Sequence, residues 1–153
     1  MAKTAELASE KTRTFSLKSP LLAEGRTMDL LAATDMMTAH VKVYAEGGEN
    51  VLHAHTEEDH LFVILAGQAT FYLGREERVT IVNKHEGVLI PKGNHYWFHA
   101  SGGENLVLLR VGAKKNGYNG VDDRVGADGN PLPGESAANK HVAPVTVPGK
   151  FFS

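Results

Sequence analysis

The sequence contains no cysteine, and this absence limits how the chain can be cross-linked or bind a metal. It excludes disulfide bonds and thiolate ligands, so any metal site must use nitrogen and oxygen donors. Long apolar stretches are also missing, because no run approaches the ~20 residues that a membrane-spanning helix needs. The first residues, MAKTAELASEKTRTFSL, lack the apolar segment of a secretory signal peptide. We therefore expect a cytoplasmic protein with no membrane partner.

A charge imbalance is absent as well. The chain carries 16 Lys and Arg against 18 Asp and Glu, a net charge of −2. This near-balance gives no electrostatic reason to expect a nucleic-acid partner or an anionic membrane surface. A length of 153 residues with 42% hydrophobic content is enough for one domain with a sizeable core, and we expect residues 1–153 to form a single domain.

No helical period is sustained in the central part of the chain. Short apolar segments instead alternate with turn residues at a spacing of about 8–12 residues, which predicts an all-β sandwich or barrel. The predicted strands cover residues 36–44, 69–73, 79–82, 88–90, 95–99 and 106–111. In the first of them, His40, Lys42 and Tyr44 share one face. The pattern leaves open which face points inward, and we expect His40 to be solvated.

The segment 113–153 differs from the centre in composition. It is rich in Gly, Asn, Asp and Pro, which predicts a loop or an irregular tail. Asp122, Asp123 and Asp128 lie in it, but their spacing does not fit a calcium-binding loop, and we interpret them as solvated turn residues. The apolar end, residues 147–152, is expected to dock on its own barrel or on a partner subunit.

The most informative stretch is residues 47–67, GGENVLHAHTEEDHLFVILAG. His53 and His55 are two residues apart, so on a strand they share a face about 6 to 7 Å apart. His60 follows a polar turn and opens an apolar strand, which can bring it back towards the first two histidines. Imidazoles in this arrangement can converge on one ion at about 2.0–2.1 Å per bond, so the stretch predicts a metal site.

This stretch resembles the first motif of the cupin family, G-x5-H-x-H-x(3,4)-E-x6-G. The spacing from Gly47 through His53 and His55 to Gly67 fits throughout. The family usually has Glu where this chain has His60. Asp59 competes for that position, but it would leave seven residues before Gly67 in place of six, so His60 is preferred.

The family's second motif, G-x5-P-x-G-x2-H-x3-N, is matched more loosely by GVLIPKGNHYWFH. Gly87, Pro91, Gly93 and His95 stand in order, with two gaps shorter than the motif requires, and His99 takes the place of the final Asn. The resemblance covers residues from about 35 to 112, between an N-terminal arm (1–34) and the C-terminal tail (113–153). It implies a single small jelly-roll β-barrel.

The resemblance also implies a ligand set and a pocket. Transferred from the family, the metal ligands are His53, His55, His60 and His95, holding one divalent transition-metal ion per chain. The metal is not distinguished among Fe(II), Zn, Ni and Mn, since imidazole suits several of these ions. His99 is the candidate catalytic residue, with a role beside a ligand or at the rim as alternatives. The expected substrate-binding walls are Phe62, Ile64, Phe71 and Trp97.

Four neutral imidazoles would leave the charge of the ion uncompensated, so such a site should attract anionic oxygen, as in a carboxylate or an enolate. Three functions remain open for a small-molecule ligand. The first is an Fe(II)-type dioxygenase acting on an enolisable molecule, and the second is a redox-neutral Zn, Mn or Ni lyase, isomerase or cyclase. The third is a non-catalytic binder of a small molecule or metal. The resemblance further implies a homodimer.

Overall fold

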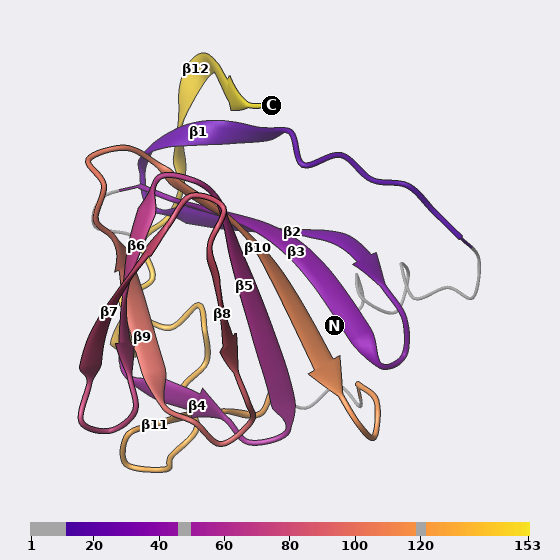
Figure 1. The fold of residues 1–153 in the computed structure, drawn as a ribbon, viewed down its shortest axis with the longest axis vertical. Coiled ribbons are helices and arrows are strands. Elements are labelled where there is room, and N and C mark those ends of the chain that lie inside the picture. Colours follow the sequence, from indigo (N-terminus) through magenta and orange to yellow (C-terminus); the bar gives the residue numbers. More distant parts are fainter. Residues whose placement is uncertain (1–11, 46–49, 119–121) are drawn as a thin grey trace.

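The computed structural model describes residues 12–45, 50–118 and 122–153. In this part of the chain the strands form two five-stranded sheets and one two-stranded sheet (Figure 1). The first sheet has the order β2 (Arg26–Ala33), β3 (Met37–Tyr44), β10 (Leu106–Lys114), β5 (Glu58–Ala66) and β8 (Gly87–Ile90). The second has the order β11 (Arg124–Gly126), β4 (His53–His55), β9 (Tyr96–Ala100), β6 (Gln68–Leu73) and β7 (Arg78–Asn83). The third pairs β1 (Ser19–Glu24) with β12 (Val145–Phe152).

The strand pairings within these sheets are antiparallel. The all-β jelly-roll fold predicted from the sequence is confirmed, with the two large sheets facing each other and remaining separate sheets rather than a closed barrel. The six strands predicted from the pattern all occur, most of them within one residue of the expected ends. Because each sheet must bury one face, alternate residues of these strands point into the space between them.

Strand β5 shows this alternation most clearly. Glu58, His60, Phe62 and Ile64 are buried, whereas Asp59 between the first two is exposed. The strand pairs with β10, which places Gly112 opposite His60. The inward face of β5 is therefore polar at its start and apolar further along.

An aromatic and aliphatic cluster fills the apolar part of the space between the sheets. Phe71 and Phe98 stack with 4.7 Å between their ring centroids, and Tyr44 meets Phe98 edge-on at 5.0 Å. The buried members of the cluster are Tyr44, Phe62, Ile64, Ala69, Phe71, Val82, Ile90, Tyr96, Phe98, Leu106 and Leu108. Such packing is the main favourable term in the stability of a domain of this size.

Both ends of the chain contribute more regular structure than the sequence predicted. The expected arm contains β1 and β2, and the expected tail contains β11, a 3-10 turn at Ala137–Asn139 and β12. The last strand pairs with β1, with Phe152 opposite Ser19, so the apolar C-terminus docks on its own chain. The homodimer stays a prediction. In the described ranges, no helix is long and apolar enough to cross a membrane.

Candidate metal centre

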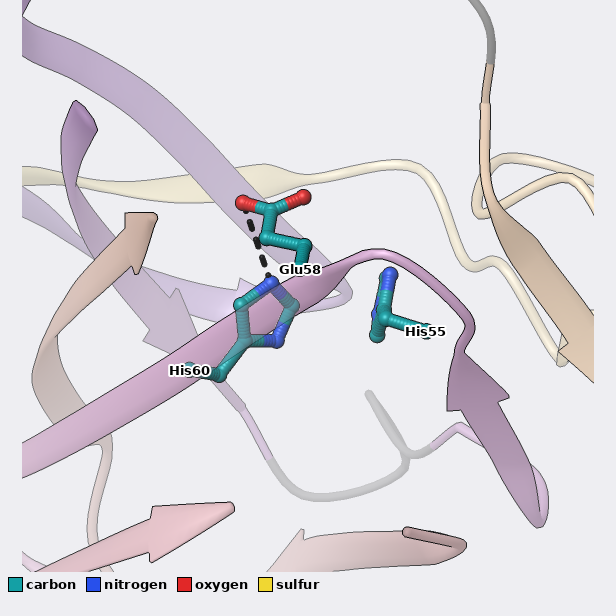
Figure 2. A group of neighbouring side chains, drawn as sticks. All are labelled: His55, Glu58 and His60. Carbon is teal, nitrogen blue, oxygen red and sulfur yellow. Dashed lines mark ion pairs between the residues drawn. The ribbon is translucent and has the colours of Figure 1, made fainter. Parts of the chain in front are cut away.

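Three buried side chains form a group of possible metal ligands at the polar start of β5. The donor atoms of His55, Glu58 and His60 all lie within 4.8 Å of one another. Figure 2 shows His55 approaching from β4, while Glu58 and His60 project from the same strand. Bonds of about 2.1 Å put two ligand atoms of one ion at most about 4.2 Å apart, so the group must contract by only a few tenths of an ångström to hold an ion.

Hydrogen bonds orient the two histidines of β4. The Nδ1 of His55 lies 2.9 Å from Oδ1 of Asp123, and the Nδ1 of His53 lies 2.7 Å from the carbonyl oxygen of Val51. A carboxylate and a carbonyl can only accept, so each Nδ1 carries the proton and each Nε2 keeps its lone pair. Both Nε2 atoms are buried and have no hydrogen-bond partner in the described part of the chain. This arrangement is typical of histidines that bind a metal through Nε2.

His60 and Glu58 share a positively charged neighbour. The Nε2 of His60 is 3.2 Å from Oε1 of Glu58, a close approach of two electron-rich atoms (Figure 2). The terminal guanidinium nitrogen of Arg110 lies 2.8 Å from that Nε2 and 3.5 Å from that Oε1. Because a guanidinium can only donate, we assign the lone pair to the Nε2 of His60. Arg110 thus supplies the cation that both groups face.

Two further residues shape the position of Glu58. The hydroxyl of Tyr118 donates a hydrogen bond to Oε1 of Glu58 at 2.8 Å. Gly112 lies directly beside the same carboxylate, and a Cβ at that position would overlap Oε1. The absent side chain of Gly112 therefore provides the space in which the Glu58 carboxylate lies.

The electrostatic environment keeps the histidines neutral. Burial lowers the pKa of His53 and His60 well below the usual value, and the positive charge of nearby arginines lowers it further. Burial also lowers the pKa of His55, against the opposing effect of Asp123. For Asp123, burial opposes ionisation, but the hydrogen bonds from His55 and from the Glu57 amide outweigh it and hold its pKa well below the ordinary value. Neutral imidazoles are the form that binds a metal.

The structure does not bring His95, Trp97 or His99 to this group. All three share the outward face of the β9 segment, where Trp97 stacks on Tyr72 at 4.0 Å and His99 lies 3.2 Å from the Tyr72 hydroxyl. His95 is half-buried, its Nε2 lacks a hydrogen-bond partner in the described chain, and its lowered pKa reflects burial and then the charge of Arg75. The four-histidine site is therefore not confirmed.

Tyr96 takes the inward position that was expected of His95. Its ring lies 4.4 Å from that of His53, and its hydroxyl is 3.2 Å from Nδ1 of His60. Burial raises the pKa of Tyr96 to about 12, so the phenol keeps its proton. The family spacing P-x-G-x2-H, counted strictly from Pro91, leads to Tyr96 rather than His95, so the sequence did contain this signal.

The expected pocket walls have a different role. Phe62, Ile64 and Phe71 are almost fully buried within the apolar cluster, and none of them lines the cavity beside the metal group. Asp59, the alternative ligand, is exposed and accepts a hydrogen bond from the Lys92 amide at 2.8 Å. The structure therefore favours His60 over Asp59.

A cavity of about 740 Å³ adjoins the candidate ligands. Most of the residues that line it are polar or charged, in contrast to the aromatic and aliphatic walls that were expected. His40 and Lys42 line it and are only 9% and 7% exposed, so the prediction that His40 is solvated is wrong. The cationic residues of the wall are Arg26, Lys42, Arg110, Lys114 and Arg124.

Sequence reasoning missed two kinds of site residue. Glu58 could have been found, because strict alternation along β5 places it on the same face as His60. Asp123 and Arg124 come from the segment expected to be an irregular tail, and the strand pairing of Arg124 with His55 brings them to the site. Asp123 is 7% exposed, so the interpretation as a solvated turn residue is wrong for it.

Comparisons with known proteins agree with this architecture. The family model for the cupin domain matches residues 40–112. An uncharacterised conserved protein with a double-stranded β-helix domain from Klebsiella pneumoniae is similar in structure, with TM-score 0.59 and 21% identity over 71% of this chain and 95% of that one. KdgF from Halomonas sp. is similar with a TM-score of 0.58 and 16% sequence identity, over 69% of this chain and 97% of that one. The Schizosaccharomyces pombe Cnp3 cupin domain is similar with a TM-score of 0.57 and 20% sequence identity, over 63% of this chain and 70% of that one. A comparison with curated proteins gives no match.

Proposed function

Because the domain match and the fold support the cupin superfamily, we propose that this chain is a metal-dependent enzyme acting on a small anionic organic molecule. One observation carries the proposal. The Nε2 atoms of His53 and His55 are buried and without a hydrogen-bond partner among the described residues, although their Nδ1 atoms are held by acceptors. Burying polar atoms without partners is costly, and a bound cation removes that cost.

The residues present fit one divalent transition-metal ion per chain. His53, His55 and His60 would supply neutral nitrogen donors, and Glu58 would supply a carboxylate oxygen. An ion between His60 and Glu58 would require the Arg110 guanidinium to give up its present contacts with both. When bound, the ion would supply a Lewis acid or an oxygen-binding centre at the edge of the cavity.

The first candidate activity is that of an Fe(II)-type dioxygenase. Two histidines with one carboxylate and open positions are the ligand set typical of non-haem Fe(II) oxygenases, and His55, Glu58 and His60 provide this combination. The site expected from the sequence had no carboxylate. The presence of Glu58 therefore increases the support for this activity, and the adjoining cavity provides room for a substrate.

A redox-neutral lyase, isomerase or cyclase using Zn, Mn or Ni is the second candidate. The observation that favours it is the cationic wall of the cavity, because positive charge stabilises an enolate or a similar anion formed from the substrate. A non-catalytic binder would use the same ligands. The metal bound in the cell separates the two enzyme candidates, since iron favours the dioxygenase and zinc, manganese or nickel the redox-neutral enzyme.

Elemental analysis of protein purified without added metal tests the proposal. We expect about one transition-metal ion per chain, and less than a tenth of that in His55→Ala and His60→Ala. His85→Asn is the matched control, since His85 is exposed and has a positive φ of 72°, which Asn tolerates. Full metal content in the first two variants, or none in wild-type protein under every loading condition, would contradict the proposal. Oxygen consumption on adding small enolisable acids then tests the dioxygenase specifically.

A further inference from the structure

Four of the five cationic residues that line the cavity, all except Lys114, are considered as one group beside the candidate metal ligands. Lys42 and Arg110 lie on the inward faces of β3 and β10, Arg26 begins β2, and Arg124 reaches the cavity from β11 of the other sheet. Burial lowers the pKa of Lys42 well below the ordinary value, and the positive charges of Arg110, Arg124 and Arg26 lower it further. The cavity wall thus concentrates positive charge from both sheets around one buried lysine.

The nearby buried carboxylates are already engaged, and neither of them contacts Lys42. Glu58 accepts from Tyr118 and contacts Arg110 at 3.5 Å, while Asp123 accepts from His55 and from the Glu57 amide. The other acidic residues of the wall, Asp29, Asp122 and Glu135, are exposed. The buried part of the wall therefore carries more positive than negative charge.

The side chains of two of the arginines form hydrogen bonds to other parts of the chain, but among the described residues that of Lys42 does not. Arg26 donates to the carbonyl oxygens of Gly134 and Asn139 at 2.9 and 3.3 Å, and Arg124 donates to the side chain of Asn139 at 3.3 Å. These hydrogen bonds to neutral acceptors hold the segment around the 3-10 turn. Lys42 contacts the ring of Tyr44 at 5.2 Å and makes no hydrogen bond or ion pair in the described ranges.

A buried charge without an anionic partner is costly, and a ligand that supplies the anion recovers that cost. A guanidinium also matches a carboxylate or a phosphate through two parallel hydrogen bonds. We propose that Lys42, with Arg110 and Arg124, forms an anion subsite that binds a carboxylate or phosphate group of the ligand. This inference names the substrate class of the proposed enzyme and in that respect rests on the proposed function.

The position of Arg110 joins the subsite to the metal group. Its guanidinium contacts His60 and Glu58 and also lines the cavity with Lys42. A ligand anchored by its acidic group at Lys42 and Arg110 therefore extends towards the candidate metal ligands. The subsite favours small acids with a separate reacting part over neutral molecules.

Calorimetric and thermal-shift titrations test the subsite on the full-length protein, both as purified and after metal removal with the neutral chelator phenanthroline and dialysis. The probes are succinate, inorganic phosphate and the neutral diamide succinamide at constant ionic strength. We expect succinate or phosphate to bind both preparations and to raise the melting temperature, and succinamide to do neither. Tighter binding of phosphate would identify a phosphate ester as the ligand class, and tighter binding of succinate a carboxylic acid.

The deciding variant is Lys42→Met, which removes the charge but keeps the volume of the side chain. We expect at least a tenfold loss of anion affinity, whereas ligand-free stability stays equal or rises because an unpaired buried charge is removed. Lys84→Met, an exposed lysine in a turn, is the matched control and should bind as wild type does. Equal anion affinity in Lys42→Met, or binding of succinamide as tight as that of succinate, would overturn the subsite. Metal content of about one ion per chain in Lys42→Met would leave the metal proposal standing, so the two failures are distinguishable.

Discussion

The two ends of the space between the sheets are built by the same strands but carry opposite kinds of side chain. On β5 the inward residues at one end are Phe62 and Ile64, both at most 1% exposed and packed in the apolar cluster. Two and four residues before Phe62, the same face carries His60 and Glu58, which are also buried, at 1% and 6% exposed. Both ends are therefore buried, but one is lined by apolar side chains and the other by polar and charged ones.

The neighbouring strands also pass from apolar to charged residues along their inward faces. The inward face of β3 passes from Tyr44 to Lys42, and that of β10 passes from Leu108 to Arg110. Burying apolar side chains is favourable, while burying charges without full pairing is not. The comparison indicates that burial of the apolar end stabilises the fold enough to offset the unfavourable burial of polar and charged groups at the other end, as is usual at functional sites.

The largest effect is expected at the apolar end. Phe71→Ala should lower the free energy of unfolding by about 3–5 kcal/mol, because it leaves a cavity where Phe71 stacks on Phe98. Phe15→Ala, which truncates a 52%-exposed aromatic, should change it by less than about 0.5 kcal/mol. Urea unfolding measures both. Loss of ligand binding in Phe71→Ala without a loss of stability would instead identify Phe71 as the substrate wall predicted from the sequence.

The next effect belongs to the polar end and should appear in metal affinity. Asp123→Asn weakens the hydrogen bond that orients His55, so we expect metal affinity to fall about 10- to 100-fold. Asp59→Asn is the control, since the exposed Asp59 bonds only the Lys92 amide among the described residues. Competition with a chromophoric chelator measures both affinities. A larger loss in Asp59→Asn than in Asp123→Asn would restore Asp59 as the ligand.

The difference between the two ends also explains how much could be predicted from the sequence. The fold and the group around His55 and His60 follow from local spacing, because strand alternation places residues two apart on one face. The second motif was assigned one residue out of step, and this shift turned His95 inward and Tyr96 outward. In a strand such a slip exchanges the two faces completely, so one short gap misplaced His95, Trp97 and His99 together.

The remaining site residues depend on contacts that no local pattern contains. Asp123 meets His55 from 68 positions further along the chain, through the pairing of β11 with β4. The Gly and Pro content around it predicts a loop, and the short strand within that segment forms only because the second sheet has a free edge there. The inward position of Lys42 was likewise undecidable, since a positive charge on a strand face usually indicates the solvent side.

A third prediction uses pH to separate the two ends. The lowered pKa values of His53, His55 and His60 mean that the unfolded state binds protons near pH 6.5 while the folded state does not. The free energy of unfolding of the metal-free protein should therefore be highest above about pH 7 and fall as the pH drops below about 6.5. Each of these histidines lowers it by about 1.4 kcal/mol per pH unit, until the pH reaches the pKa of that histidine in the folded state. Urea unfolding between pH 7.5 and 5.5 measures this slope.

The control for that slope lies in the variants. Phe71→Leu should lose stability by a similar amount at every pH, because the apolar end carries no group that titrates in this range. His53→Asn should have a shallower slope than wild type, and His85→Asn the same slope. A wild-type stability that stays flat down to pH 5.5 would contradict the burial of three neutral histidines.

The smallest effect concerns Tyr96, where the inward phenol stands at the position of the family's second-motif histidine. Among the described residues, two tyrosine hydroxyls lie 3.2 Å from a histidine nitrogen, Tyr96 from His60 inside and Tyr72 from His99 outside. Tyr96→Phe removes a buried hydrogen bond and should lower the free energy of unfolding by about 1 kcal/mol, whereas Tyr72→Phe should cost less because water replaces the lost partner. If the phenol only positions His60, Tyr96→Phe keeps about one metal ion per chain, and Tyr96→His binds the metal more tightly by adding a neutral donor. Loss of the metal in Tyr96→Phe, with Tyr72→Phe unaffected, would instead show that the phenol oxygen is itself a ligand. In that case the polar end would hold the ion with one more oxygen donor than His53, His55, His60 and Glu58 supply.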